Sequence, residues 1–282
     1  MGHAFAPLPL SVVAPARNEH DNLEPLVEEI ESALEPAAID FEIVIVDDGS
    51  TDGTARLLAS MLIRHPRLRV VRMRDARPDR GAGQSAAFHA GIRASRGKVI
   101  VTLDADRQYD PRDIPLVVDR LAATGAGMVQ GDRTAGRRDS IFRRLSSLVG
   151  RLFRRLLLGD TVRDTGCSLR AMHREVALAL PLQYRGMHRY IPIRARQMGC
   201  TVIEIPVRHR PRAAGISKYG TWDRAVVGIY DCLAVRWMGR REGPVRYDAV
   251  EPARSEAAGI RDIPDGGTGE CSDRMIHTPD TL

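Results

Sequence analysis

The chain has 282 residues, of which 43% are hydrophobic and 28% are charged, and its formal net charge is +6. This composition is typical of a folded domain of ordinary polarity, and it excludes a fibrous chain and a chain that is disordered throughout. The basic balance predicts an anionic partner, such as a nucleotide, a nucleic acid or a phosphate-bearing membrane surface.

Apolar segments rich in β-branched residues alternate with segments that have apolar residues at every third and fourth position. The first kind predicts strands and the second predicts helices. Strands are expected at residues 10–16, 41–47, 68–73 and 98–104, with helices at NLEPLVEEIESAL, GTARLLASMLI and QSAAFHAGIRAS between them. Further strands are expected at GMVQGDR and TVIEIPVRHR. The alternation predicts an α/β fold with a parallel sheet covered by helices on both faces.

Acidic and amide side chains follow three of the predicted strands. In chain order they are Asn18, Glu19, Asp47, Asp48, Asp104 and Asp106. Ligands of such sheets bind beyond the carboxyl ends of the parallel strands. We therefore expect these side chains to gather at one crevice.

The pair formed by Asp104 and Asp106 follows the fourth strand, and Gln108 offers a neutral oxygen nearby. Hard oxygen ligands of this kind suit Mg²⁺ or Mn²⁺ together with substrate phosphates. The alternative is a helix N-cap, but Asp110, directly before Pro111, fits that role better. The sequence therefore predicts a metal- and phosphate-binding site here.

The segment VDDGSTDGT after the second strand allows two interpretations. It can be a tight turn in which Ser50 or Asp52 caps the next helix. Asp47 and Asp48 precede that turn, and their carboxylates can also accept hydrogen bonds from a base or a ribose.

Several segments carry a resemblance to a known family: VVAPARNEHDNL, EIVIVDDGSTDGT, GQSAAFHAGI, VTLDADRQYDP, RDTGCSLRAMHRE and HRYIPIRARQMGCTVIEIPVRHRPRAAGISKYG. Together they resemble the family 2 glycosyltransferases with the GT-A fold. The resemblance implies a Rossmann-like α/β fold with a mixed, mainly parallel sheet and helices on both faces. Within that family they are similar to the polyprenyl-phosphate branch, which includes dolichol-phosphate mannose synthases. The resemblance covers about residues 10–220.

The resemblance implies roles for individual residues. Asp104, Asp106 and Gln108 would hold the divalent metal, Mg²⁺ or Mn²⁺, and the diphosphate of a nucleotide sugar. The residues that would bind the nucleotide sugar are Pro15, Ala16, Arg17, Glu19, Asp47, Asp48, Gln84, Arg212 and Lys218. Of these, Arg212 and Lys218 look like part of a loop that closes over the donor and excludes water.

The acceptor phosphate would be held by basic and hydroxyl side chains, because bidentate arginine suits a phosphate. The family's counterparts here are Arg133, Arg143, Arg144 and Ser147. Asp164 has two interpretations, as a catalytic residue that orients the acceptor or acts as a base, or as a brace for its loop. Cys167 is expected to be a packing residue rather than a nucleophile, and His188 and His209 are expected to be structural.

Residues 140–160 combine apolar residues at helical spacing with five arginines. That composition predicts either a basic helix packed on its own domain or a helix at an anionic membrane surface, and the resemblance favours the membrane. We expect a catalytic domain over residues 1–220, an amphipathic and possible membrane-interfacial helix over 221–242, and a polar, disordered tail over 243–282. No apolar run reaches the ~18 residues of a membrane span.

The sequence hypothesis is a metal-dependent, inverting transfer of a hexose from GDP-mannose or a UDP-sugar to polyprenyl phosphate, either dolichyl or undecaprenyl. The widely spaced cysteines predict a reduced, cytoplasmic setting. The resemblance adds the expectation of an enzyme that is peripheral on the inner face of the membrane. The alternatives are a family 2 transferase with a soluble glycan or protein acceptor, and a non-catalytic nucleotide-binding or membrane-associated protein. Nucleic-acid binding is not expected, because aromatics are only 5%; an oligomer is possible.

Overall fold

The computed structural model describes residues 9–37, 39–134, 141–210 and 221–243, without the side chains of 141–149 and 221–227. Met1–Arg240 forms one compact unit and Arg241–Leu282 a second. Apart from the last residue of α8, all helices and strands below belong to the first unit.

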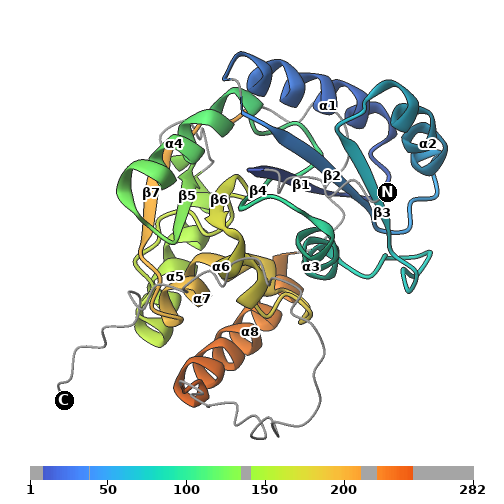
Figure 1. Cartoon of the computed structure of the whole chain (residues 1–282). Coiled ribbons are helices and arrows are strands. Elements are labelled where there is room, and N and C mark those ends of the chain that lie inside the picture. Colours follow the sequence, from blue (N-terminus) through green and yellow to red (C-terminus); the bar gives the residue numbers. More distant parts are fainter. Residues whose placement is uncertain (1–8, 38, 135–140, 211–220, 244–282) are drawn as a thin grey trace, which may run out of the picture. The chain divides into compact units, whose positions relative to one another are not determined.

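The described residues form a seven-stranded sheet with the strand order β3-β2-β1-β4-β6-β5-β7 (Figure 1). The strands are β1 Leu10–Ala16, β2 Phe41–Asp47, β3 Leu68–Arg72, β4 Val99–Thr102, β5 Met128–Asp132, β6 Arg170–His173 and β7 Val202–Pro206. β6 pairs antiparallel with β4 and β5, while the other pairs are parallel. The predicted α/β fold with a mixed, mainly parallel sheet is therefore confirmed.

Helices cover both faces of the sheet. The α-helices are α1 His20–Leu34, α2 Thr54–Arg64, α3 Gln84–Ala94, α4 Ile114–Thr124, α5 Ile141–Leu158, α6 Arg174–Ala179, α7 Ile191–Gln197 and α8 Thr221–Arg241. Short 3₁₀ turns lie at η1 Glu35–Ala37, η2 Pro111–Asp113 and η4 Met187–Arg189. α1, α2 and α4 contribute to the core on one face, and α3, α6, α7 and α8 to the core on the other.

Alternate side chains of each strand enter opposite cores. Val12 and Ala14 of β1 belong to the cluster with α1, whereas Val13 belongs to the cluster with α3. Because successive side chains of a strand point to opposite faces, a strand covered on both faces is mainly apolar. This is why β1 and β2 read as largely apolar runs in the sequence. The buried exceptions Ser11 and Glu42 satisfy each other, since Ser11 Oγ donates a hydrogen bond of 2.7 Å to Glu42 Oε1.

Two local details differ from the sequence prediction. β4 ends at Thr102, whereas the apolar pattern predicted a strand to Asp104, because after Leu103 the chain leaves the sheet. β6 was not predicted at all, since it has only four residues, RAMH, and two of them are polar, which is too short a segment to show an apolar pattern. Arg170 is nevertheless only 2% exposed, because buried partners satisfy its guanidinium.

The topology determines where a ligand can bind. β2 and β3 lie on one side of β1, and β4 lies on the other. The order of successive strands therefore reverses between β1 and β4, and α/β sheets bind ligands at the carboxyl ends of strands at such a reversal.

The close packing of α3 on the sheet can be tested at Gly91. A Cβ added there would lie 2.5 Å from Val13 and 2.8 Å from Val46. We expect Gly91→Ala to lower the free energy of unfolding by about 1–3 kcal/mol through overpacking, although alanine is the better helix former. In the control Gly228→Ala, on α8, the added Cβ meets no atom within 4 Å. Denaturant unfolding should show the control unchanged or more stable, and a more stable Gly91→Ala would contradict the close contact.

Candidate functional site

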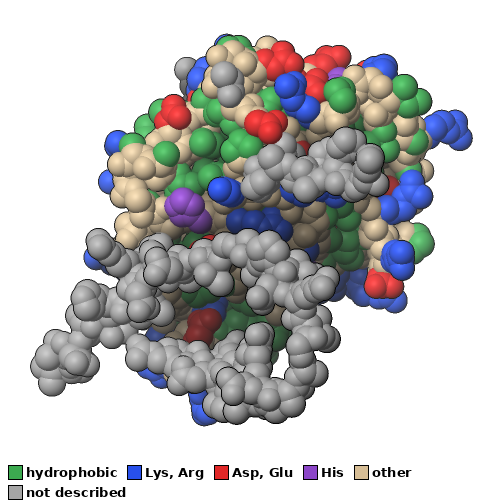
Figure 2. All heavy atoms as spheres, viewed as in Figure 1, with side chains coloured by type: hydrophobic (Ala, Val, Ile, Leu, Met, Phe, Trp, Pro, Cys, Tyr) green, Lys and Arg blue, Asp and Glu red, His purple; other side chains and the backbone are tan. Residues whose placement is uncertain are grey.

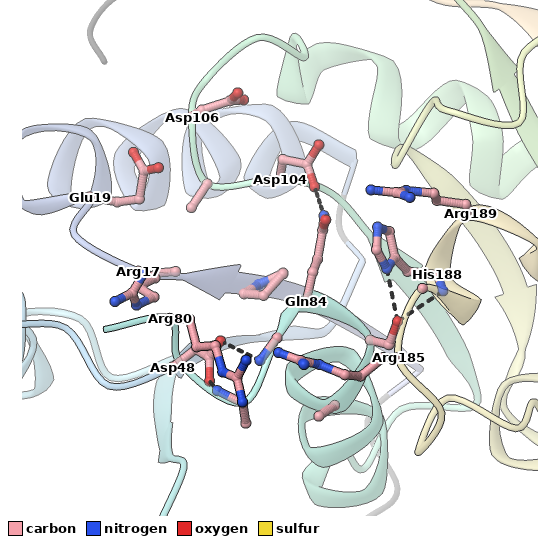
Figure 3. A pocket seen from close by; sticks show the side chains of 18 of the residues that line it. Arg17, Glu19, Asp48, Arg80, Gln84, Asp104, Asp106, Arg185, His188 and Arg189 are labelled. Atoms are coloured by element: carbon pink, nitrogen blue, oxygen red, sulfur yellow. Dashed lines mark hydrogen bonds between the residues drawn. The ribbon is translucent and has the colours of Figure 1, made fainter. Parts of the chain in front are cut away.

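A crevice of ≈ 740 Å³ lies at the carboxyl ends of β1 and β4 (Figure 3). One wall comes from the chain after β1, the chain after β2 and the loop before α3, and the opposite wall from residues 183–189 and α8. Its lining consists of Pro15, Ala16, Arg17, Glu19, Asp48, Arg80, Ala82, Gly83, Gln84, Ser85, Ala86, Asp104, Ala105, Asp106, Gln183, Arg185, Gly186, His188, Arg189 and Asp231. The three strand ends that the sequence singled out therefore do meet.

The predicted acidic pair lies between the two walls. Gln84 Nε2, in the first turn of α3, donates a hydrogen bond of 2.6 Å to Asp104 Oδ1, and Asp106 is only 7% exposed. Burial, and then the nearby charge of Asp106, raise the pKa of Asp104 to about 6. A cation bound between the two carboxylates would relieve the repulsion that Asp106 exerts on Asp104.

Two arginines near the acidic pair partly offset its charge. Positive charge from Arg170 and Arg133 opposes the rise in the pKa of Asp104. Arg170 Nε donates to Gln130 Oε1 at 2.8 Å, and Arg170 Nη2 donates to the carbonyl of Thr165 at 3.1 Å. Since β6 lies beside β4, the antiparallel strand missed in the sequence brings this cation to the site.

Asp48 organises the loop that precedes α3. Its two carboxylate oxygens accept hydrogen bonds from the backbone N–H groups of Ala82, at 2.6 Å, and Gly83, at 2.9 Å. Gly81 has φ +69°, and a Cβ there would lie 2.3 Å from Asp48 Oδ2, so this turn requires glycine. Asp48 thus lines the crevice and also holds its wall in place.

The neighbouring residues divide between the crevice and its supports. Glu19 lines the crevice and accepts a hydrogen bond from Asn22 Nδ2 at 2.6 Å. Asn18 and Asp47 are not part of the lining; Asp47 Oδ1 accepts from the N–H of Ser50 at 2.9 Å. Asp52, one of the two predicted caps, accepts from the N–H of Thr54 at the start of α2. A role of Asp47 at the nucleoside stays a prediction.

The opposite wall carries residues that the sequence did not single out for binding. Arg185 and Arg189 line the crevice, and neither guanidinium has a hydrogen bond or ion pair with the described residues. Figure 3 shows Arg189 extending from this wall toward Asp104, and Arg185 extending toward the start of α3. Two such guanidinium groups can hold an anion. The sequence signal for them was weak, because 40 other basic residues compete with it (42 Lys and Arg in all).

His188 links this wall to α3. Its Nδ1 is 2.8 Å from Ser85 Oγ, which also accepts a hydrogen bond of 3.1 Å from the backbone N–H of His188. Burial, followed by the charges of Arg189 and Arg170, lowers the pKa of His188 to about 3. The imidazole is therefore neutral near pH 7, so the structural role expected for His188 has a physical basis.

Arg133 and Asp164 form a buried pair outside the crevice lining. Arg133 Nε donates to Asp164 Oδ2 at 2.7 Å, and Nη2 donates to Oδ1 at 2.9 Å. Although burial acts in the opposite direction, these hydrogen bonds raise the pKa of Arg133. The contact supports the bracing interpretation of Asp164. The catalytic role of Asp164 and the acceptor role of Arg133 stay predictions.

Gln108 does not line the crevice, and its backbone is used in the turn instead. Its N–H donates to Asp106 Oδ1 at 3.2 Å, and its carbonyl accepts from the N–H of Arg210 at 2.8 Å. The preceding Arg107 has φ +57°, which is rare for a residue with a side chain. The role of Gln108 as a metal ligand stays a prediction.

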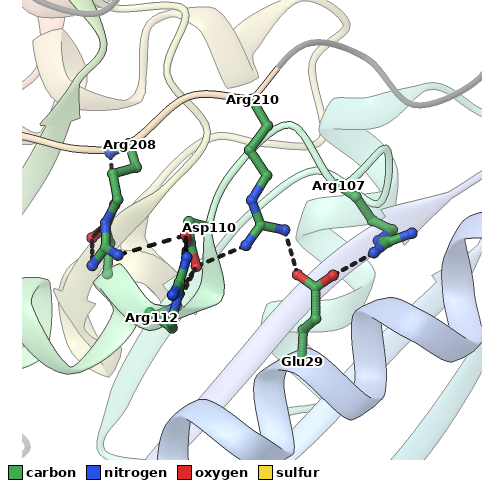
Figure 4. A network of polar contacts seen from close by, with 7 residues as sticks. Glu29, Arg107, Asp110, Arg112, Arg208 and Arg210 are labelled. Atoms are coloured by element: carbon green, nitrogen blue, oxygen red, sulfur yellow. Dashed lines mark hydrogen bonds and ion pairs between the residues drawn. The ribbon is translucent and has the colours of Figure 1, made fainter.

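A network of charged side chains holds this turn in place (Figure 4). Glu29 of α1 forms ion pairs with Arg107 and Arg210, and Arg210 also contacts Asp110 Oδ1 at 3.1 Å. Asp110 caps η2 as predicted, and the hydrogen bonds from Arg112 hold its pKa well below the usual range. The network thus joins α1, the turn after β4 and the chain after β7.

Some predicted residues cannot be placed. Arg143, Arg144 and Ser147 belong to α5, but their side chains lie outside the described part of the chain. Arg212 and Lys218 lie outside it entirely. All five assignments stay predictions.

Cys167 fits the packing role expected for it. The side chain is fully buried, and burial raises its pKa to about 12, so the thiol stays protonated. A protonated thiol is a poor nucleophile.

The neutral state of His188 predicts a pH dependence of stability. The unfolded chain binds a proton on this histidine below its ordinary pKa of about 6.5, whereas the folded chain resists protonation down to about 3. Stability therefore falls with pH in that window, by up to about 1.4 kcal/mol per pH unit from this group. In His188→Asn this contribution should be absent. Unfolding measured from pH 8 to pH 4 should show the wild type losing more stability than the variant; parallel curves would contradict a neutral His188.

The Arg133–Asp164 pair can be tested with a double-mutant cycle. Their side chains are 11% and 5% exposed. Asp164→Asn leaves a buried guanidinium uncompensated and should cost about 3–5 kcal/mol of unfolding free energy. Replacing both residues, as Arg133→Met with Asp164→Leu, should recover most of that loss. Single and double losses that simply add would show that the two side chains do not interact.

Comparison with known proteins gives a consistent result. The family model described as glycosyl transferase family 2 matches residues 11–180. An undecaprenyl-phosphate 4-deoxy-4-formamido-L-arabinose transferase of Pectobacterium carotovorum is 37% identical over 79% of this chain and 66% of the relative. A transferase with the same description from Pseudomonas aeruginosa PAO1 is 40% identical over 74% of this chain and 60% of the relative. The chain thus matches 60–66% of the length of these relatives.

Solved structures share the fold. Glucosyl-3-phosphoglycerate synthase from Mycobacterium tuberculosis, crystallised with Mn²⁺, UDP and glucosyl-3-phosphoglycerate, superimposes with a TM-score of 0.60 at 22% identity, covering 83% of this chain and 80% of that one. Mannosyl-3-phosphoglycerate synthase from Rubrobacter xylanophilus gives 0.59 at 20% identity, covering 83% and 74%. These similarities confirm the expected GT-A fold. Because the family model spans more than half of the chain, the protein belongs to glycosyl transferase family 2.

Proposed function

We propose that this protein transfers a glycosyl group from a nucleotide sugar to the phosphate of a polyprenyl phosphate, with the help of a divalent metal ion. The proposal extends the family assignment by the acceptor named for the relatives, undecaprenyl phosphate. It keeps GDP-mannose and UDP-sugars as candidate donors, and a sugar like 4-deoxy-4-formamido-L-arabinose joins them from the relatives' names.

One observation carries the proposal. The buried acidic pair, Asp104 and Asp106, and the unpartnered guanidinium groups of Arg185 and Arg189 line the same crevice. Carboxylates attract a cation and guanidinium groups attract phosphate oxygens, so the crevice suits a metal-bound diphosphate and a second anion together. Figure 2 shows Lys or Arg side chains near the middle of the face that Figure 1 presents.

A divalent metal fits the residues present. Asp104 and Asp106 would hold it, since both carboxylates line the crevice and the charge of Asp106 adds to burial in raising the pKa of Asp104. Among the described residues no group of three or more His, Cys, Asp or Glu side chains is placed to bind a metal. Mg²⁺ is commonly held by one or two carboxylates with substrate phosphates, which is the arrangement proposed here. The metal would neutralise charge on the diphosphate leaving group.

The remaining chemistry falls to positioning. A phosphate monoester is largely ionised near pH 7, so the acceptor needs no strong general base. Its charge must be brought next to the donor diphosphate, which arginine side chains allow by neutralising the repulsion. Arg185 and Arg189 are placed for this in the described crevice, and Arg143, Arg144 and Ser147 are the residues that the family resemblance adds.

Exposed apolar side chains support contact with a membrane surface. Leu152 and Leu156 of α5 are 56% and 72% exposed, and Tyr230 and Trp237 of α8 are 71% and 62% exposed. Arg151 and Arg155 lie exposed beside them. This combination is typical of helices at an anionic lipid interface. The opposite side of α8, with Cys232 and Val235, is buried, so this helix is apolar on two sides rather than one. No helix in the described ranges has the length and apolar character needed to span a bilayer.

The proposal predicts that Asp106→Asn will lower turnover by at least about 100-fold, because the removed carboxylate would hold the metal that neutralises charge on the diphosphate leaving group. Transfer would be measured with GDP-mannose, UDP-glucose and UDP-N-acetylglucosamine, with undecaprenyl and dolichyl phosphate in vesicles, and with Mg²⁺ or Mn²⁺. Asp119→Asn, an exposed carboxylate on α4, is the matched control and should keep wild-type activity.

The result has clear alternatives. Full activity in a folded Asp106→Asn variant would contradict the site assignment. Transfer to a soluble glycan or protein with none to polyprenyl phosphate would favour the soluble-acceptor alternative.

A further inference from the structure

Helix α8 contributes a carboxylate to the crevice. Asp231 lies far along the chain from the strand ends, yet it lines the same crevice as Asp104 and Arg189. Its Oδ2 atom is buried and has no hydrogen-bond partner among the residues that the structure describes. Buried polar oxygens nearly always have a partner, so one without a partner at a ligand crevice calls for an explanation.

Contacts of neighbouring residues hold Asp231 in place. The next residue, Cys232, is 3% exposed, and its Sγ lies 3.3 Å from the hydroxyl of Tyr190. The same hydroxyl donates a hydrogen bond of 3.2 Å to the carbonyl of Gly228. One turn of α8 is therefore held against the residue that follows η4. A side chain on such a fixed helix can position a ligand.

The backbone opposite Asp231 makes room for its carboxylate. Gly186 has φ +79°, and a Cβ at this position would lie 2.6 Å from Asp231 Oδ2. Any larger residue would displace the carboxylate as well as strain the backbone. Arg185 and Arg189 flank this glycine in the sequence and also line the crevice. The end of the crevice formed by residues 183–189 and α8 thus presents one hydrogen-bond acceptor, Asp231, and two hydrogen-bond donors, Arg185 and Arg189.

The carboxylate is also poorly compensated. Burial raises the pKa of Asp231, and the charge of Arg189 lowers it only in part. No hydrogen bond between the two side chains is formed. A ligand that donates a hydrogen bond would supply the partner that Asp231 Oδ2 lacks among the described residues.

We propose that Asp231 binds the glycosyl group of the donor by accepting a hydrogen bond from one of its O–H or N–H groups. The inference rests on the proposed function and assigns the part of the substrate that this end of the crevice recognises. A nucleotide sugar has its diphosphate between its two ends, and the acidic pair lies between the two walls of the crevice (Figure 3). With the nucleoside at the wall formed by Pro15–Glu19 and Asp48, the sugar lies at the wall that includes Asp231.

This contact would give selectivity among sugars. A site that hydrogen-bonds a substrate group rejects an analogue that lacks the group, because its own buried polar atom is then left unpaired. Donors with a hydroxyl or an amide N–H in reach of Asp231 would be favoured over the corresponding deoxy sugars.

The test compares a nucleotide sugar with its own nucleoside diphosphate. Isothermal titration with Mn²⁺ would use UDP-glucose against UDP, UDP-N-acetylglucosamine against UDP, and GDP-mannose against GDP. Asp231→Ala should weaken the best nucleotide sugar by about 10-fold, equivalent to about 1.4 kcal/mol, and leave the diphosphate within about twofold. Glu204→Gln is the matched control, since Glu204 is another half-buried carboxyl whose pKa is raised by burial, but it lies outside the crevice lining.

Stability supplies a second readout. Because Oδ2 lacks a partner, Asp231→Asn should leave the melting temperature of the free protein unchanged or raise it, while still weakening the nucleotide sugar. A purely structural aspartate would lower the melting temperature and affect both ligands alike.

The outcomes separate the two proposals. Equal losses for the nucleotide sugar and the diphosphate, or no loss for either, would overturn the role of Asp231 and leave the proposed function standing. Absence of binding to the wild type of these three nucleotide sugars and of a nucleotide sugar that carries 4-deoxy-4-formamido-L-arabinose would overturn both.

Discussion

The site depends on the burial of two carboxylates at the end of a strand. Asp104 and Asp106 follow β4 within one turn, where burial and mutual repulsion raise the pKa of Asp104 to about 6. Two negative charges in this position are unfavourable by themselves, and neighbouring side chains partly offset their repulsion. Gln84 donates a hydrogen bond to Asp104, and the charges of Arg170 and Arg133 lower its pKa. A divalent cation would neutralise the negative charge that these side chains leave uncompensated.

The residues that hold this pair in place come from several segments of the first unit. α3 is packed so closely on β1 and β2 that only glycine fits at residue 91, and this places Gln84 at the crevice. Asp48 fixes the loop before α3 through two backbone N–H groups. Glu29 holds the turn after β4 from the other side, through Arg107 and Arg210. Rigid supports of this kind keep the few groups that would contact a ligand at fixed distances.

The two walls of the crevice differ in chemistry, and this difference underlies both proposals. One wall is built from strand ends and the loop before α3, with backbone amides and carboxylates that already bind one another. The other wall leaves Arg185 and Arg189 without hydrogen bonds or ion pairs, and Asp231 Oδ2 without a hydrogen-bond partner, within the described part of the chain. Groups left unsatisfied at a crevice are available to a substrate. A sugar with hydroxyl or amide groups, attached to a diphosphate, matches this set of donors and acceptors.

The sequence by itself determined the α/β class, most strand positions, the acidic pair, the cap at Asp110 and the family, because apolar periodicity and short motifs are local properties. It did not reveal β6, since a strand of four residues with only two apolar side chains shows no apolar pattern, and Arg170 becomes acceptable in a buried strand only beside Gln130 and Thr165. The sequence also did not indicate Arg185, Arg189 and Asp231. Charged residues usually lie on the surface, and no local pattern distinguishes these three from other surface residues. Only the tertiary structure brings α8 and residues 183–189 to the ends of β1 and β4, because contacts between segments so distant in the chain depend on packing rather than on local propensity.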